Sequence, residues 1–427
     1  MANNLLTISM ITNEALAVLE NELTFTAGVD RQYDDQFAVV GAKIGNTVNV
    51  RRPGRFLGTT GPALNVEDFN ETSVPVVLGD PTKYGAQFHV DTQFTTQDLA
   101  LSLDRFSDRI LKTAIAAIAN KVDRDGLSMA KNTTANIVGT AGTPPTGLIT
   151  YLTAGAYLDA EAAPRDGKRS VVIEPFTSAT IVDSLKGLFT PADKIGEQYR
   201  KGMMGRDASG MDWLMDQNVV SQTFGSWAGA SASTLTTNTT TFTGSLSTGW
   251  ASTSTITLAQ GATLTLNQGD VIQIANVYAV NPQNRQPYGT NKLRSFVVQS
   301  TVTGTGSGTM SVTVSPAIIT GGQFQNVSVG STSTTATVTP FSAGVSGTGI
   351  VSPQNILFHR WAYTMAMADL ELPEGVHFAG RASDKEAGLS IRVVRQYTIN
   401  NDSIPTRLDV LYGWAPLYPE LACRIAA

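Results

Sequence analysis

The residues of this 427-residue chain that could most readily do chemistry are three histidines and one cysteine: His89, His359, His377 and Cys423. Their spacing fits no zinc site. His359 and His377 are the candidates for a general base, yet neither has a nucleophile in a recognisable setting. We therefore interpret both as histidines that are hydrogen-bonded in a core or an interface. The lone Cys423 cannot form an intrachain disulfide, and its apolar surroundings predict that it packs as a small hydrophobic residue.

Two short motifs resemble ligand-binding loops, but both lack essential residues. The glycine run at 304–308 has no following Lys-Ser/Thr pair, so a hairpin turn is expected there instead of a phosphate loop. The run Asp123-Arg124-Asp125-Gly126 has part of a calcium loop but no bidentate Glu at the required spacing, so we expect it to decorate a helix end. The sequence therefore predicts no active site, no cofactor and no metal, and a protein that is not an enzyme.

One charged group remains as a candidate contact site. Arg51, Arg52 and Arg55 stand beside a Pro-Gly turn, and the same stretch ends in acidic residues. These acids are Glu67, Asp68 and Glu71. The arginines could bind phosphate, pair with carboxylates of a neighbouring subunit, or simply be solvated. Because the acids lie in the same loop, we favour pairing between subunits.

The composition excludes several classes of protein. Charged residues make up 15% of the chain and hydrophobic residues 42%, whereas a disordered chain has high charge and low hydrophobicity. The net charge of −5 argues against a general polyanion-binding protein. No apolar run approaches the roughly 18 residues that would span a bilayer, and no charged region precedes the apolar stretch at Leu5 and Leu6. We expect a soluble protein, cytoplasmic when made.

The chain changes composition abruptly between residues 217 and 351. The charged side chains of this stretch are Asp270, Arg285, Lys292 and Arg294. Alternating Thr, Val and Leu predict half-buried strands over 255–258, 263–266, 271–280 and 311–314. A flexible Ser/Thr stalk is the alternative. Because the flanks resemble each other more than the middle, we interpret this stretch as a β module inserted into a host domain.

The host segments mix helices and strands, which makes the fold class α+β. We expect a short helix over 14–23, capped at Thr12 or Asn13, and strands over 47–52 and 74–78 on either side of a long hairpin-like loop. A capping box at residues 95–98 opens an apolar stripe that persists to about residue 132, a helix of roughly 50 Å. A strand over 170–174 and a helix over 178–189 follow. Further strands are expected over 389–399, 408–412 and 421–425.

This order of parts resembles the major capsid protein of tailed double-stranded DNA bacteriophages, the HK-ninety-seven-like fold, and within it the phage P-twenty-two coat protein family. The residues that carry the resemblance are SGMDW at 209–213, DQN at 216–218, RVVRQY at 392–397, RLDVLYGW at 407–414 and PELA at 419–422. These motifs are structural, and the resemblance covers almost the whole chain.

The resemblance implies a division of the chain into parts. These are an N-arm at 1–43, an E-loop at 48–74, a peripheral domain with a spine helix at 76–132 and 388–427, an axial domain at 137–222 and 353–387, and an inserted all-β, barrel-like domain at 223–352. It also implies non-covalent self-assembly into hexamers and pentamers of an icosahedral shell, with scaffolding protein and portal as partners.

The function implied is that of a virion structural protein. The shell would be assembled in the host bacterial cytoplasm and would enclose phage double-stranded DNA without sequence-specific binding, and no membrane contact is expected. The alternative is an adhesin or other virion surface protein whose Ser/Thr-rich β domain binds a host glycan.

Overall fold

The computed structural model describes residues 8–34, 45–52, 54–66, 72–95, 112–184, 209–226, 235–237, 250–260, 263–289, 291–305, 308–330, 336–341, 349–384 and 388–427. The chain divides into two compact units. Unit 1 comprises residues 1–50, 74–129 and 363–417, and unit 2 comprises residues 51–73, 130–362 and 418–427. Each unit is thus assembled from segments that lie far apart in the sequence.

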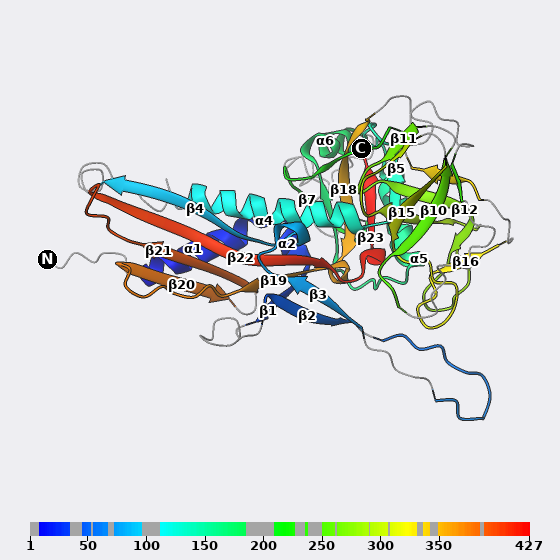
Figure 1. Cartoon of the computed structure of the whole chain (residues 1–427), viewed down its shortest axis with the longest axis horizontal. Coiled ribbons are helices and arrows are strands. Elements are labelled where there is room, and N and C mark those ends of the chain that lie inside the picture. The colour runs from blue at the N-terminus through cyan, green and yellow to red at the C-terminus, as the bar shows by residue number, and fades with distance from the viewer. Residues whose placement is uncertain are drawn as a thin grey trace, which may run out of the picture. The chain divides into compact units, whose positions relative to one another are not determined.

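A six-stranded sheet forms the body of unit 1 (Figure 1). Its strands, in spatial order, are β1 (Asp30–Asp34), β19 (Tyr363–Ala368), β22 (Ser403–Pro416), β21 (Leu389–Arg395) and β20 (Phe378–Asp384), with β4 (Ala86–Thr95) also paired to β22. The 14-residue strand β22 pairs with β19, β21 and β4 along different parts of its length, and so organises the sheet.

The helices described in unit 1 are α1 (Ile8–Glu22), α2 (Phe25–Gly28) and α4, of which Lys112–Met129 belongs to unit 1 and whose last residue is Thr133. The carboxylate of Asp123, in α4, is buried and accepts hydrogen bonds from the backbone N–H groups of Thr24, Phe25 and Thr26 at 2.7, 3.2 and 3.1 Å. These are donors that the start of the short helix α2 would otherwise leave unpaired. Asp123 therefore fixes the N-terminal segment to α4.

The ring of Trp414 packs directly on the backbone of α4. It lies 5.4 Å from the Phe25 ring, and both rings approach Gly126 so closely that a Cβ there would lie 2.7 Å from Trp414 and 2.8 Å from Phe25. Tyr412 also donates a hydrogen bond of 2.7 Å to Asp125 in the same helix. Gly126 is thus required by packing, because any larger side chain would separate α4 from β22.

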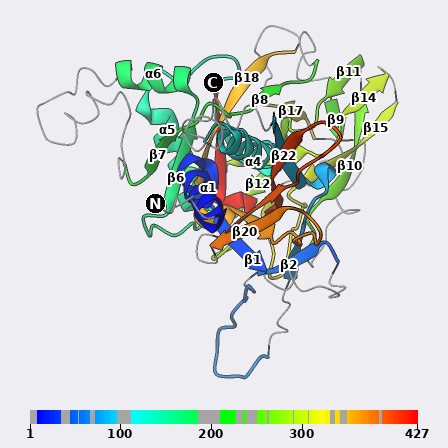
Figure 2. The ribbon, with the colours of Figure 1, turned by 90° about the vertical axis from the view of Figure 1, so that its left-hand side faces the viewer.

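A second six-stranded sheet lies in unit 2. Its strands are β5 (Ile137–Gly139), β23 (Ala422–Ala426), β18 (Val351–His359), β6 (Arg169–Ile173) and β7 (Asp212–Met215), with β8 (Ser221–Thr223) paired to β18. Helices α5 (Leu148–Ala160) and α6 (Pro175–Ser184) lie near β6 and β7 in Figure 2 and share a core with this sheet. Cys423 is fully buried in that core, as expected.

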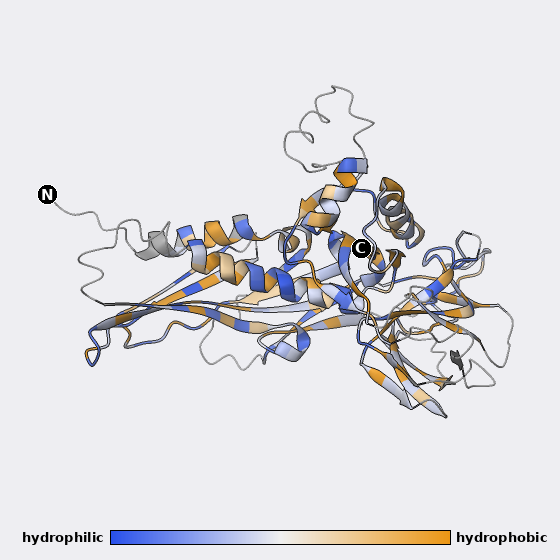
Figure 3. Cartoon of the chain, turned by 90° about the horizontal axis from the view of Figure 1, so that it is seen from above, coloured by the Kyte–Doolittle hydropathy of each residue, from blue (hydrophilic) through white to orange (hydrophobic). Residues whose placement is uncertain are grey.

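A seven-stranded antiparallel sheet completes unit 2. Its strands are β16 (Val327–Val329), β12 (Val271–Ala279), β13 (Leu293–Val298), β15 (Thr309–Ser315), β10 (Ser254–Gln260) and β9 (Leu235–Thr237), with β17 (Val338–Pro340) on β12. Beside it, β11 (Thr263–Leu266) pairs with β14 (Val302–Thr305). Hydrophobic and hydrophilic residues alternate along the strands (Figure 3), and the apolar set of this sheet forms its own core.

The remaining elements are short. Strands β2 (Thr47–Arg52) and β3 (Thr72–Val77) form a two-stranded sheet, and 3-10 turns occupy Pro81–Lys83, Arg360–Ala362 and Pro419–Leu421. No helix in the described part of the chain combines the length and the apolar content that crossing a membrane would need.

The strand predictions agree well with this architecture. The strands expected at 47–52, 74–78, 170–174, 255–258, 263–266, 271–280, 311–314, 389–399, 408–412 and 421–425 correspond to β2, β3, β6, β10, β11, β12, β15, β21, β22 and β23. The glycine run at 304–308 begins in β14 and ends just before β15, but β14 pairs with β11 and β15 with β10 and β13, so the expected hairpin between the flanking strands is not found among the described residues.

The helix predictions need three corrections. Helix α1 begins at Ile8, so Thr12 and Asn13 lie inside it and are not caps, because apolar residues at 8, 11, 15 and 19 extend the helical spacing toward the N-terminus. Thr95 ends β4, and residues 96–111 lie outside the described residues, so the capping box and the first half of the expected long helix stay predictions. The run Asp123–Gly126 is internal to α4 and does not decorate its end. Helix α5 was not anticipated.

The expected helix over 178–189 is described as α6, which begins earlier, at Pro175, and whose described part ends at Ser184. Residues 185–208 lie outside the described part of the chain.

Replacing Gly126 by Ala should lower the free energy of unfolding by about 1–3 kcal/mol, because the new methyl group would displace the rings of Trp414 and Phe25. The measurement is urea denaturation of the unassembled subunit. Gly155→Ala in α5 is the matched control, since a Cβ there would meet the Met211 side chain at an ordinary 3.5 Å. That control should be neutral or slightly stabilising. Equal effects of the two changes would contradict the packing argument.

Candidate functional site

The segment that follows β2 is the most exposed part of unit 2. Residues 54–66 contain no helix or strand, and every side chain from 56 to 66 is exposed. The exposed fractions are 62% for Phe56, 44% for Leu57, 91% for Leu64 and 79% for Val66. Figure 1 shows this segment as an open excursion beyond the ends of β2 and β3. Apolar side chains that the fold leaves uncovered mark a candidate contact surface.

The base of this loop is held by Arg52. Its guanidinium lies 4.9 Å from the centre of the Trp250 ring and 5.3 Å from that of Tyr418, which places a cation over two aromatic faces. Burial lowers the pKa of Arg52, and the nearby Glu420 carboxylate only partly opposes that shift. Arg52 therefore already has interaction partners within its own chain, the rings of Trp250 and Tyr418.

Glu420 is the acidic centre of the same region. Burial alone would raise its pKa, but Arg55, Arg52 and Arg294 outweigh burial and hold the pKa below its ordinary value. A cavity of about 260 Å³ adjoins it, with Arg55, Trp361 and Tyr418 among its lining residues. Glu420 thus stays ionised beside the loop base.

The structure separates the predicted contact residues into three groups. Arg51 is exposed, whereas Arg52 and Arg55 are half-buried beside Glu420. Glu67, Asp68 and Glu71 lie outside the described residues. Pairing between subunits therefore remains a prediction, while Arg52 already has aromatic partners in its own chain.

Sequence reasoning missed the partners of Arg52 and Arg55. Trp250, Tyr418 and Glu420 stand about 200 and 370 positions further along the chain. No local spacing connects them to the loop, although the aromatic residues of the closing segment were recognisable as candidates for a core or an interface.

A buried ion pair lies close to this region. Arg294, in β13, pairs with Glu161 at the end of α5, and the two side chains are 1% and 4% exposed. Tyr288 donates a hydrogen bond of 3.2 Å to the same carboxylate. Burial alone would lower the pKa of Arg294, but Glu161 and Tyr288 outweigh burial and raise it. Removing one member of such a pair is strongly destabilising, because the other charge is then left buried without a partner. The pair therefore links the seven-stranded sheet to α5.

A second buried carboxylate lies where the seven-stranded sheet meets β8. Asp270 accepts hydrogen bonds from Gln222 Nε2, the Gly225 N–H and the Asn267 N–H at 2.8, 3.0 and 2.8 Å. Lys131 donates to the same Gln222 side chain at 2.7 Å. Burial and the nearby Arg424 lower the pKa of Lys131 to about 8. Asp270 thus connects the residues in and just after β8 to the residues that precede β12 of the seven-stranded sheet.

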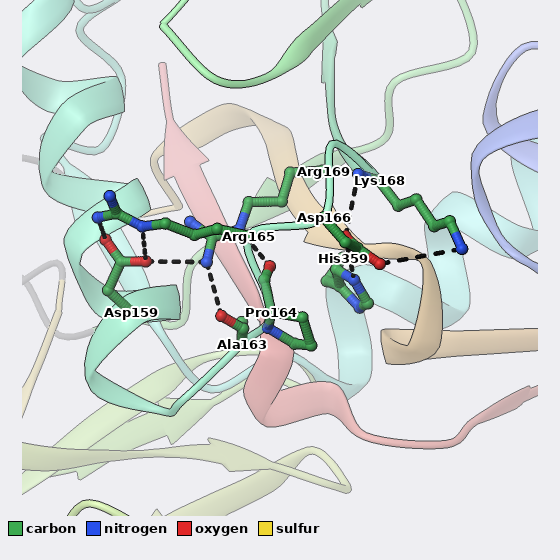
Figure 4. Close-up of polar contacts among 8 residues, drawn as sticks. All are labelled: Asp159, Ala163, Pro164, Arg165, Asp166, Lys168, Arg169 and His359. Atoms are coloured by element: carbon green, nitrogen blue, oxygen red, sulfur yellow. Dashed lines mark hydrogen bonds and ion pairs between the residues drawn. The ribbon is translucent and has the colours of Figure 1, made fainter.

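Figure 4 shows a polar cluster between α5 and β6. Asp159 binds both Arg165 and Arg169, the latter at 2.8 Å. Asp166 lies 3.1 Å from His359 Nε2 and also accepts a hydrogen bond from the backbone N–H of Lys168. These contacts fix the turn that precedes β6.

His359 is fully buried and its two ring nitrogens have different partners. The Trp361 N–H donates to Nδ1 at 3.3 Å, so the ring proton resides on Nε2, which donates to Asp166. The prediction that His359 is a hydrogen-bonded core residue is confirmed. His377, in contrast, is exposed in this chain, so its interpretation as a core residue is wrong, and an interface role stays a prediction.

None of these arrangements forms a reactive centre. Within the described ranges, no group of three or more His, Cys, Asp and Glu residues is placed to hold a metal. A cavity of about 480 Å³ beside α5 is lined by Leu152, Met211 and Leu357. Its two arginines, Arg165 and Arg169, are bonded to Asp159. The feature of the described residues that stands out for contacts is the exposed apolar loop at 56–66.

One family model matches almost the whole chain. Residues 1–424 match the model of a family described as "P22 coat protein - gene protein 5". No curated protein sequence matches significantly.

Several solved structures are similar at low sequence identity. The capsid of Ralstonia phage GP4 has a TM-score of 0.45 at 8% identity, covering 95% of this chain and 88% of that chain. The mature capsid of bacteriophage PhiM1 has a TM-score of 0.44 at 11% identity, covering 94% and 86%. A chain of Mycobacterium phage Che8 has a TM-score of 0.42 at 11% identity, covering 94% and 90%.

Acidification should destabilise the fold through His359. Burial lowers its pKa from 6.5, Asp166 partly opposes this, and Arg169 and Lys168 add to the lowering. The unfolded chain therefore binds the extra proton more readily, so stability falls as the pH drops below about 6.5, by up to about 1.4 kcal/mol per pH unit until the folded-state pKa is reached.

Urea denaturation of the unassembled subunit between pH 7.5 and 5 measures this effect. The His359→Gln variant should show a shallower dependence of stability on pH than the wild type. If the free energy of unfolding of His359→Gln depended on pH as steeply as that of the wild type, His359 would not be the group responsible.

Proposed function

The chain belongs to the P22 coat protein family and is a phage major capsid protein, and we propose that its copies join as hexamers and pentamers of an icosahedral shell around packaged double-stranded DNA. The product would be the virion capsid, assembled non-covalently in the host bacterial cytoplasm. Each subunit then needs only modest interfaces, because closure of the shell makes many weak contacts act together.

One observation carries this proposal within the chain itself. Residues 56–66 form a fully exposed loop that holds four large apolar side chains. A soluble monomer gains nothing from such a loop, whereas a subunit that buries it on a neighbour gains the free energy of covering apolar surface. We propose that the loop becomes covered by an adjacent copy.

The finer assignments follow from the family. The chain would have the HK-ninety-seven-like fold, with the seven-stranded sheet as the core of the β domain inserted at 223–352. The N-arm at 1–43 and the E-loop at 48–74 would be the parts that contact neighbours. The peripheral domain would be 76–132 with 388–427, and the axial domain 137–222 with 353–387. Scaffolding protein and portal are the further partners proposed.

Enclosed DNA requires little adhesion to the wall. A net charge of −5 disfavours binding to a polyanion, so we propose that the inner wall contacts DNA without sequence preference. The adhesin alternative explains the Ser/Thr-rich sheet, but no contact in the described structure favours a glycan.

Purified protein should form closed particles of megadalton mass, seen by negative-stain electron microscopy and by sedimentation velocity. Particle formation should be compared between protein expressed with a scaffolding protein and protein expressed without one. A small oligomer under both conditions, at every concentration tested, would exclude the shell.

The predicted ion pairs can be tested by complementation between subunits. Reversing the loop acids (Glu67→Lys, Asp68→Lys, Glu71→Lys) should lower particle yield about tenfold, since each lost pair costs roughly 0.5 kcal/mol at every interface. Arg51→Glu should do the same. A mixture of the two variants should recover particles, because oppositely charged partners then meet across subunits. Recovery only when all four changes share one chain would show that the pairs form within a subunit.

A further inference from the structure

A six-residue turn of the inserted β domain is tied to α5. The Asn281 side chain donates a hydrogen bond of 2.9 Å to the carbonyl of Ala160, the last residue of that helix. The backbone carbonyl of Asn281 accepts a hydrogen bond from the Arg285 N–H at 2.8 Å. The backbone N–H of Asn281 donates to the Gln286 carbonyl at 3.0 Å. Arg285 itself has a φ of 56°, a left-handed conformation that only a well-defined turn stabilises in a residue with a side chain. The turn is therefore a rigid support.

The Arg285 side chain leaves this turn toward the exposed loop. Its Nη2 donates to the carbonyl of Phe56 at 2.7 Å, and its Nη1 approaches the carbonyl of Leu57 at 3.4 Å. The Phe56 and Leu57 side chains are 62% and 44% exposed, so the contact with Arg285 is made through the backbone of the loop. A charged donor that spans two successive carbonyls is a strong restraint on a segment without secondary structure.

We propose that Arg285 is a positioning residue through which the inserted domain sets the direction in which the loop leaves its own subunit. Residues before 56 are held by Arg52 and its aromatic partners, and Arg285 extends the restraint to residue 57. Beyond that point Gly58 and Gly61 adopt φ values of 67° and 119°, backbone conformations that glycine tolerates and other residues rarely adopt. The part of the loop that can extend to a neighbouring subunit then comprises residues 58–66. This last step rests on the proposed function of the loop.

Chymotrypsin provides a direct readout in the unassembled full-length subunit. Cleavage after Phe56 requires the protease to bind the same carbonyl that Arg285 occupies, whereas Leu64, at 91% exposure, lies outside the restraint and serves as an internal reference. In the Arg285→Ala variant, the ratio of the cleavage rate at Phe56 to that at Leu64 should rise about tenfold. Arg285→Lys, which can still donate to one carbonyl, should give an intermediate ratio.

The matched control is Arg165→Ala, which removes an equally charged side chain that is bonded to Asp159, and it should leave the ratio unchanged. Circular dichroism establishes that each variant is folded. An unchanged ratio in folded Arg285→Ala protein would overturn the proposal.

Particle yield separates this inference from the proposed function. If the ratio rises and Arg285→Ala subunits also assemble more slowly than Arg165→Ala subunits, the positioning role in assembly is supported. A raised ratio with unaltered assembly would overturn that role. Failure of the wild type itself to assemble would refute the shell, while the cleavage ratio would still report whether Arg285 restrains the loop.

Discussion

Charged side chains hold the segment 223–352, the proposed inserted β domain, to the rest of its unit. The segment has four charged residues: Asp270 and Arg294 are buried, Arg285 is half-buried and Lys292 is exposed, and each contacts a residue outside the segment. Arg294 pairs with Glu161, Asp270 binds Gln222 and the backbone of Gly225, Arg285 reaches the loop carbonyls, and Lys292 lies 5.9 Å from the Tyr157 ring. Because a buried charge is tolerated only with its partner in place, these contacts define one arrangement of the two parts.

The same device recurs in unit 1, where carboxylates join segments distant in sequence. Asp409 of β22 is fully buried and binds Arg392 of β21 at 2.9 Å and Arg407 at 3.2 Å, and it accepts from Gln87 of β4 at 3.2 Å. Asp123 does so between α4 and α2. Charged residues make up only 15% of the chain, and several of them thus form buried contacts that join segments distant in sequence.

The contrast between what the sequence revealed and what it concealed has a physical basis. Alternating strands such as β10 and β15 were predictable, because period-two patterning is local and one face must be buried. Helix α5 was not, since LITYLTAGAYLDA has no polar stripe, and its buried side combines Tyr151 and Leu158 with the small residues Ala154 and Gly155. Asp123 looked like surface decoration, because the backbone donors that it satisfies lie almost 100 residues earlier. The loop was recognised from its composition, but its supports, Trp250, Tyr418 and Arg285, could be found only in the folded chain.

The placement of these charges also determines how the segment 223–352 responds to its solvent. Asp270 and Arg294 are buried, so added salt has little access to them, whereas Lys292 is exposed. Exposed pairs elsewhere, such as Arg165 with Asp159, are open to such screening. The attachment of this segment to α5 and β8 through Arg294 and Asp270 should therefore depend little on ionic strength, so a change from dilute to saline water would leave it in place.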